Sequence, residues 1–180
     1  LQVTTEKNAG KTAPKPTVAA VTSTSVTLNA VSGCEYRVGN GAWQTSPLFE
    51  GLSPATSYVF YQRYAETSSA FAGGTSAGTS VTTDKKSGKT APAPTLKSAS
   101  ADTVILNAYT GMEYRRAGGT WQSSATFTGL SPNTAYTFYQ RYAETADSYA
   151  GAESPAFTAA TSKQAGGTAA KPELVSVSDT

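Results

Sequence analysis

The segment Gly51-Leu52-Ser53-Pro54-Ala55-Thr56-Ser57-Tyr58-Val59-Phe60 carries the strongest structural signal in this sequence. It returns 78 residues later as Gly129-Leu130-Ser131-Pro132-Asn133-Thr134-Ala135-Tyr136-Thr137-Phe138. Both copies place a turn-forming Ser-Pro ahead of residues that alternate between aromatic and small or polar side chains. Alternation with a period of two is typical of a strand with one buried face. Each copy therefore predicts a turn that leads into a half-buried strand.

The duplication extends far beyond this segment. Residues 10–87 align with residues 88–165 without a gap, and 39 of the 78 positions are identical. Self-similarity at a fixed period indicates a repeated folding unit. We therefore expect one repeat at 10–87 and a second at 88–165. Residues 1–9 match the tail of a preceding repeat, and 166–180 match the start of a following one, so we expect a longer array.

The composition favours an all-β protein and argues against several classes of function. Charged residues make up 14% of the chain, the net charge is +2, and much of the polarity comes from Thr, Ser and Gly. Thr suits strands, and Gly and Ser suit turns. The basic residues form no stripe of the kind that nucleic-acid binding needs. No apolar run approaches the length of about 18 residues that indicates a membrane helix, so we expect no membrane insertion.

Two further patterns predict strands inside each repeat. Val26, Leu28 and Ala30 alternate with polar residues, as a half-buried strand would. Asn40-Gly41 lies between strand-like runs and predicts a two-residue hairpin turn, with Val38 opposite Trp43. In the second repeat the same register predicts Arg116 opposite Trp121, with the arginine stem lying on the indole.

The opening segment resembles the fibronectin type III family. The pattern Leu-x-Pro-x-Thr-x-Tyr, present at 52–58 and 130–136, is similar to the corner before the sixth strand of that family. The resemblance implies a Greek-key β-sandwich and a tyrosine corner, in which Tyr58 and Tyr136 return their hydroxyls to the backbone of the turn. This chain lacks the family's usual Trp on the second strand, and the span from Trp43 to Tyr58 is short. We therefore expect two tandem, abbreviated Greek-key sandwiches of the fibronectin type III-like class.

The strand that follows Tyr58 has an inner and an outer face. Alternation predicts that Tyr58, Phe60 and Tyr64 point inward and that Tyr61 and Arg63 point outward. Gln62 falls on the inner side, where a buried amide needs hydrogen-bond partners that the sequence does not reveal.

No pattern in the sequence indicates catalysis or a cofactor. The chain has no histidine, which excludes Ser-His-Asp, Cys-His and histidine-based metal sites. The single cysteine, Cys34, cannot form an internal disulfide, and its replacement by Met112 in the second repeat indicates a packing role. Whether Cys34 pairs with another molecule is left open by the sequence.

The recurring carboxylates and lysines have simpler interpretations than catalysis. Glu35/Glu113 and Glu66/Glu144 accompany recurring arginines on strands that we expect to be neighbours, which predicts cross-strand ion pairs. Lys11/Lys89 and Asn29/Asn107 recur as well, but the spacing identifies no third acid for an isopeptide link. Between the repeats, 84–94 should be flexible in its charged first half and extended in its Pro-containing second half.

The remaining candidate is an outward-facing surface. We expect Glu35 and Arg37 to lie beside a recurring group of planar polar side chains on one sheet, namely Gln44, Tyr61 and Arg63 in the first repeat and Gln122, Tyr139 and Arg141 in the second. Tyr, Arg and amide groups suit binding of a glycan or of an extracellular protein loop. An ordinary cross-strand ladder explains the same residues and is the favoured interpretation.

The repeats resemble the fibronectin type III-like repeats found in large extracellular proteins of Gram-positive bacteria. That resemblance implies a non-catalytic spacer, stalk or scaffold in a secreted or cell wall-attached protein. Its partners would be neighbouring domains of the same chain, and we expect a monomer. The alternative is an adhesin-like module that binds carbohydrate or host glycoprotein, with tandem copies adding avidity.

Overall fold

The computed structural model describes residues 5–173, and every regular element in that range is a strand. The predicted all-β class is thus confirmed. Residues 1–4 and 174–180, parts of the predicted partial repeats, lie outside the described range. Residue contacts divide the chain into two compact units, Leu1–Gly88 with Glu144–Gly151, and Lys89–Ala143 with Ala152–Thr180. Within residues 5–173 no helix is long and apolar enough to cross a membrane.

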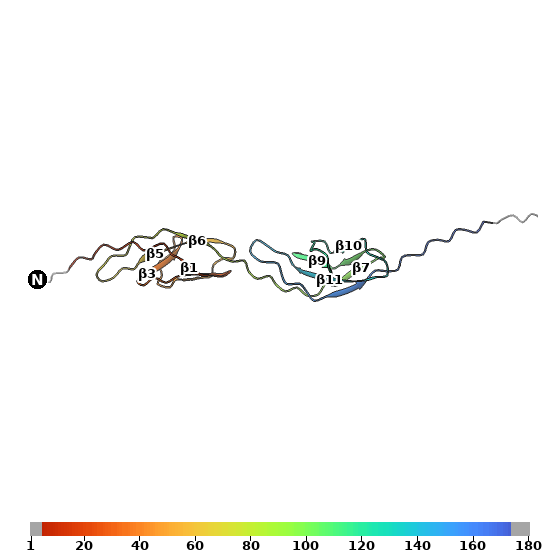
Figure 1. The fold of residues 1–180 in the computed structure, drawn as a ribbon, viewed down its shortest axis with the longest axis horizontal. Coiled ribbons are helices and arrows are strands. Elements are labelled where there is room, and N and C mark those ends of the chain that lie inside the picture. Colours follow the sequence, from red (N-terminus) through yellow and green to blue (C-terminus); the bar gives the residue numbers. More distant parts are fainter. Residues whose placement is uncertain (1–4, 174–180) are drawn as a thin grey trace, which may run out of the picture. The chain divides into compact units, whose positions relative to one another are not determined.

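The first unit contains a sandwich of two three-stranded antiparallel sheets (Figure 1). One sheet has the order β1-β2-β4 and the other β3-β5-β6. Because β2 pairs with β4 and β3 pairs with β5, the connections cross between the sheets, as in Greek-key sandwiches. The strands are β1 (Val18–Val21), β2 (Ser25–Leu28), β3 (Cys34–Val38), β4 (Leu48–Glu50), β5 (Ser57–Tyr64) and β6 (Thr79–Thr82).

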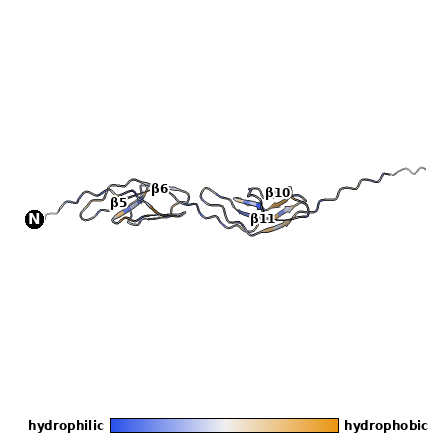
Figure 2. Cartoon of the chain, viewed as in Figure 1, coloured by the Kyte–Doolittle hydropathy of each residue, from blue (hydrophilic) through white to orange (hydrophobic). Residues whose placement is uncertain are grey.

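The second unit repeats this arrangement, with sheets β7-β8-β10 and β9-β11-β12. Polar and apolar residues both occur along the strands of each sandwich (Figure 2), as half-buried sheets require. The strands are β7 (Leu96–Ala99), β8 (Val104–Leu106), β9 (Met112–Arg116), β10 (Thr126–Phe127), β11 (Ala135–Tyr142) and β12 (Phe157–Ala160).

The core of each sandwich is built from the inward residues of both sheets. In the first, Val26 and Leu28 of β2 meet Tyr36 of β3 and Phe60 of β5, and the ring centroids of Phe49 and Phe60 are 4.9 Å apart. The predicted inward position of Phe60 is confirmed by its complete burial. At the equivalent positions the second core has Val104, Leu106, Tyr114 and Phe138.

Cys34 lies in the first core, and Met112 occupies the same position in the second. Burial raises the pKa of the Cys34 thiol above its ordinary value. The side chain is therefore a protonated apolar residue at neutral pH, which agrees with the packing role inferred from the Cys-to-Met exchange.

The turn before β5 holds the contact that the family resemblance implies. The hydroxyl of Tyr58 accepts a hydrogen bond of 2.8 Å from the amide of Ser53, and Tyr136 does the same for Ser131. The turn also requires a positive φ, 48° at Ala55 and 49° at Asn133. Asn adopts this conformation more readily than Ala, so the turn is better suited to the second repeat.

Gln62, whose inward position had no explanation from the sequence, ties the N-terminal part of the repeat to the sheet. Its Nε2 donates to the carbonyl of Pro14 at 2.8 Å, and its backbone amide donates to the hydroxyl of Ser76 at 3.1 Å. Gln140 makes the equivalent bond to Pro92 at 2.9 Å. The buried amide thus satisfies a carbonyl that no strand pairs.

Two expectations about strand positions are wrong. Strand β2 ends at Leu28, and Ala30 is exposed rather than buried. The backbone amide of Asn29 still donates to the carbonyl of Thr17 at 2.8 Å, and its side-chain Nδ2 donates to the hydroxyl of Thr17 at 2.9 Å. That bond also engages the amide that an isopeptide link with Lys11 would use.

The hairpin after β3 is shifted by one residue from the predicted register. Tyr36 lies opposite Gln44, with hydrogen bonds of 2.7 and 2.9 Å between their backbones, so Val38 is not opposite Trp43. Gly39 adopts the positive φ of the turn, which lengthens the loop to three residues. A one-residue shift moves a side chain to the other face of a sheet, and Trp43 therefore lies on the outer face. The Tyr36–Gln44 bridge takes the place of a middle strand between β3 and β4, as the short span from Trp43 to Tyr58 predicts.

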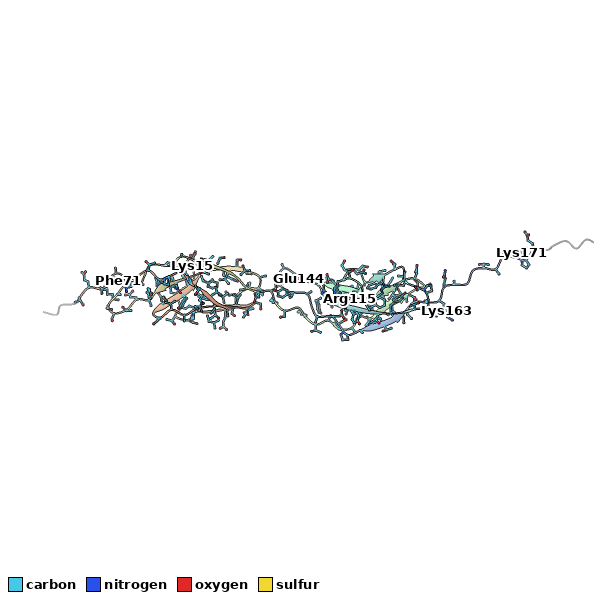
Figure 3. The ribbon with its side chains drawn as sticks, in the orientation of Figure 1. Lys15, Phe71, Arg115, Glu144, Lys163 and Lys171 are labelled. Atoms are coloured by element: carbon cyan, nitrogen blue, oxygen red, sulfur yellow. The ribbon has the colours of Figure 1, made fainter. Side chains whose placement is uncertain are left out.

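The expectation of a flexible first half of the linker is also wrong, because the segment ahead of each repeat is hydrogen-bonded to a loop. In the first, the amide of Asn8 donates to Ser69 at 2.9 Å and its carbonyl accepts from the amide of Phe71 at 3.0 Å. Lys7 pairs with Glu66 and lies over the ring of Phe71. Phe71 lies at the end of the first sandwich from which the N-terminal segment departs (Figure 3). We name residues 6–10 the docked segment.

Residues 85–88 repeat these contacts with Glu144–Gly151, and both stretches belong to the first unit. Lys86 exchanges backbone hydrogen bonds of 2.9 Å with Asp147 and Tyr149, and Lys85 Nζ lies 2.6 Å from Glu144 Oε1. Gly10 and Gly88 permit the close approach, because a Cβ at either position would lie 2.3 Å from a carbonyl oxygen.

Candidate functional site

The outer face of sheet β3-β5-β6 brings together most of the residues expected to form a surface. In the register of the sheet, Glu35 lies opposite Arg63 and Arg37 opposite Tyr61. Arg63 Nε donates to Glu35 Oε1 at 2.6 Å, so this predicted cross-strand ion pair is present. In the second repeat, Arg141 and Glu113 form the same pair at 2.9 Å. Glu66 and Glu144 instead pair with the lysines of the segments ahead of the repeats.

Trp43 is the centre of this face. Its ring centroid lies 4.6 Å from the guanidinium carbon of Arg37 and 4.4 Å from that of Arg63. Arg37 also lies 5.5 Å from the ring of Tyr61. Planar guanidinium groups stack on aromatic rings through cation–π attraction, and Trp is the best partner for it. We name Arg37, Trp43, Tyr61 and Arg63 the arginine–tryptophan face.

The second repeat carries the same face. Trp121 lies 4.4 Å from Arg141 and 5.2 Å from Arg115, and Arg115 lies 5.2 Å from the ring of Tyr139. Arg116, which the sequence places on Trp121, lies instead 5.4 Å from the ring of Tyr136, because of the shifted register. The predicted surface does not include Trp43 and Trp121, because the predicted register places them on the other face of the sheet.

Gln44 and Gln122 do not contribute a free amide to these faces. The Nε2 of Gln44 donates to the carbonyls of Ser46 and Leu48, each at 2.8 Å. Gln122 donates to Ser124 at 2.7 Å and to Thr126 at 3.0 Å. Both amide groups therefore hold the chain in place before the next strand, which leaves Tyr and Arg as the recurring polar groups of the face.

The two faces differ at one arginine. In the second repeat, Arg115 Nε donates to Glu153 Oε2 at 2.7 Å, and Nη2 contacts the same oxygen. Residue 75, which aligns with Glu153, is an exposed Thr. The Nε of Arg37 is buried and has no hydrogen-bond partner among the described residues. The only sequence signal for Glu153 is that it is a charged residue at a position where the first repeat has Thr75.

Among residues 5–173 no cluster of three His, Cys, Asp or Glu side chains could hold a metal ion. A hollow of about 300 Å³ lies between residues 8–11 and the loop at 64–71, and one of about 370 Å³ lies beside β10. Neither of these two hollows is lined by a carboxylate or a thiol, and Lys11 and Tyr64 are the ionisable residues that line the first.

No protein-family model matches the sequence, and no curated protein matches it. Among solved structures, the chain is similar to the crystal structure of the FN1-FN3 domains of chicken CNTN1. The two are 18% identical, the match covers 88% of this chain and 70% of that chain, and the TM-score is 0.36.

Proposed function

We propose that this chain is a non-catalytic spacer or scaffold segment of a large secreted or cell-surface protein. The observation that carries the proposal is that most recurring polar groups are bonded within the chain. The amides of Gln44 and Gln122 are used by the backbone, and Glu35 and Glu113 are paired with arginines. A surface whose polar groups already have partners gains little from binding another molecule.

The segments ahead of the repeats support a mechanical role. Residues 6–10 and 85–88 are hydrogen-bonded rather than free, and a spacer gains from connections that have few conformations. The resemblance to fibronectin type III-like repeats of Gram-positive extracellular proteins supports a secreted or wall-attached location. Neighbouring domains of the same chain would then be its partners.

An array of glycans and host extracellular glycoproteins tests this proposal. The full chain, which carries both repeats, is expected to bind none of them. Binding to a defined glycan or glycoprotein that Tyr61→Ala and Tyr139→Ala together abolish would contradict a purely structural role. Thr82→Ala, an exposed position at the other end of the same sheet, is the control for effects of substitution alone.

The second candidate function is recognition of carbohydrate or host glycoprotein, with two copies supplying avidity. The arginine–tryptophan faces favour it, because one guanidinium nitrogen, Arg37 Nε, has no hydrogen-bond partner within residues 5–173. The array distinguishes the two candidates directly. Under this second function the chain binds, and a tandem chain with both faces intact binds more tightly than one with a single face.

A further inference from the structure

The difference between the two arginine–tryptophan faces points to a ligand. Arg37 and Arg115 occupy equivalent positions on β3 and β9, and each stacks against a tryptophan and a tyrosine. Only Arg115 has an acid beside it, supplied by Glu153 from the segment ahead of β12. The second repeat therefore shows that an arginine in this position binds a carboxylate.

The segment that supplies Glu153 follows the same path in both repeats. The amide of Ser154 donates to the carbonyl of Gln140 at 3.0 Å, and that of Ser76 donates to Gln62 at 3.0 Å. Thr75 thus stands where Glu153 stands, but a threonine side chain has no carboxylate to pair with the guanidinium. Within residues 5–173 Arg37 forms no ion pair, and its Nε is the atom whose counterpart in Arg115 donates to Glu153.

We propose that Arg37, with Trp43 and Tyr61 as its aromatic walls, binds a carboxylate side chain of a partner protein, and that Glu153 occupies the same site in the second repeat. A buried N–H without an acceptor is unfavourable, and an arginine–carboxylate pair is a strong, charge-assisted contact. The natural occupant is a Glu on an extended segment, because that is what fills the site at Arg115. In the first repeat no residue of the described range pairs with this nitrogen, whereas in the second repeat Glu153 does.

This inference rests on the recognition part of the second candidate function and names the ligand class of the first face. It differs from that function in one respect: the second face should add no avidity, because Glu153 occupies it. The protein contains two tryptophans, one in each face, so their indole N–H signals report the two sites separately. The experiment is an NMR titration of the full ¹⁵N-labelled chain with a blocked peptide of residues 150–157, Ala-Gly-Ala-Glu-Ser-Pro-Ala-Phe. The matched control peptide carries Gln in place of Glu.

The peptide is expected to shift the Trp43 signal saturably and to leave the Trp121 signal in place, while the Gln peptide shifts neither. Thr75→Glu should weaken the response at Trp43 at least about tenfold, a difference of about 1.4 kcal/mol. Glu153→Thr should make Trp121 respond. Thr82→Glu adds the same charge at the position opposite Ser57, four residues along β5 from Tyr61, and should leave the Trp43 response unchanged.

Equal responses of the two indoles, or a Trp43 response that survives Thr75→Glu, would overturn the proposal. So would a response to trigalacturonate without one to the peptide, because the acid would then come from a glycan. If the Trp43 signal responds neither to the peptide nor to trigalacturonate while the array detects an uncharged glycan, the carboxylate site is refuted and the second candidate function stands. If both experiments are blank, this proposal fails and the spacer role stands.

Discussion

Strands β6 and β12 close equivalent sheets with different residues. In β6, Val81 packs against the first core, and the hydroxyl of Thr79 donates to the carbonyl of Pro16 at 2.5 Å. In β12, the residue equivalent to Val81 is the smaller Ala159, and the residue equivalent to Thr79 is Phe157, which packs against the second core. Apolar volume has moved two residues along the strand. Cores tolerate such exchanges when the total volume and the pattern are kept.

The arginine–tryptophan face shows the opposite behaviour. Its arginines, tryptophan and tyrosine are identical in the two repeats, together with the glutamate of the cross-strand pair. Stacking of planar groups depends on geometry at each position, so volume cannot be moved along the strand without loss of contact. The repeats thus share what requires a specific geometry and differ where only volume is required.

The largest expected effect comes from the cores, which the two repeats build alike. Phe60→Ala should cost the first sandwich about 3–5 kcal/mol, because a completely buried ring leaves a cavity. Phe138→Ala should cost the second sandwich the same. Urea titrations followed by the indole signals of Trp43 and Trp121 measure the two separately. A loss of less than about 1 kcal/mol in the free energy of unfolding would place Phe60 outside the core.

A smaller effect is expected at Gly10, because an added side chain has less room there than at the equivalent Gly166. At Gly10 an added Cβ would lie 2.3 Å from the Ala72 carbonyl oxygen, whereas at Gly166 it would meet nothing within 4 Å. Gly10→Ala should weaken the docked segment by about 1–3 kcal/mol, the usual range for overpacking. Hydrogen exchange checks this through the amides of Asn8 and Phe71, which should lose protection. Gly166→Ala is the matched control and should change no protected amide; unaltered protection in Gly10→Ala would refute the docking.

The turn before β5 offers a substitution that should stabilise. Ala55 has a φ of 48°, where its counterpart Asn133 is better suited. Ala55→Asn should raise the stability of the first sandwich by about 0.5–1 kcal/mol, and Asn133→Ala should lower that of the second by a similar amount. Urea midpoints of the two sandwiches measure both. If Ala55→Asn lowered stability, or Asn133→Ala raised it, the positive φ at this turn would not explain the difference between the two residues.

The smallest effect is the pH dependence that the thiol of Cys34 gives to the first repeat. Burial raises the pKa of the Cys34 thiol in the folded state. As pH rises past the ordinary thiol pKa, the unfolded state loses its proton first, so the folded state becomes less stable. Cys34→Met, which copies Met112, should remove this alkaline loss without changing stability at neutral pH. Denaturation midpoints at pH 7 and pH 10 for both proteins test it, and identical pH slopes would contradict the burial.

Much of the fold follows from local patterns in the sequence. The 78-residue period, the alternation through Tyr58 and Phe60, and the exchange of Cys34 for Met112 are enough to predict two all-β repeats and several core residues. They succeed because strand alternation has a strict period of two and because an internal repeat shows which substitutions a position accepts. The surface was predicted in part: Tyr61 and Arg63 lie on it, but Gln44 is used by the backbone.

Tertiary structure alone decided the rest. The conformation of Gly39 set the turn, and a single-residue change in register moved Trp43 to the outer face. The partner of Arg115 lies 38 residues away, and that of Gln62 lies 48 residues away. Local periodicity reports which face a residue takes, but it carries no information about which distant segment covers that face. The sequence by itself determined the repeat and its strands, whereas only the assembled sheets decided that Arg115 has a carboxylate partner and that Arg37 has none among residues 5–173.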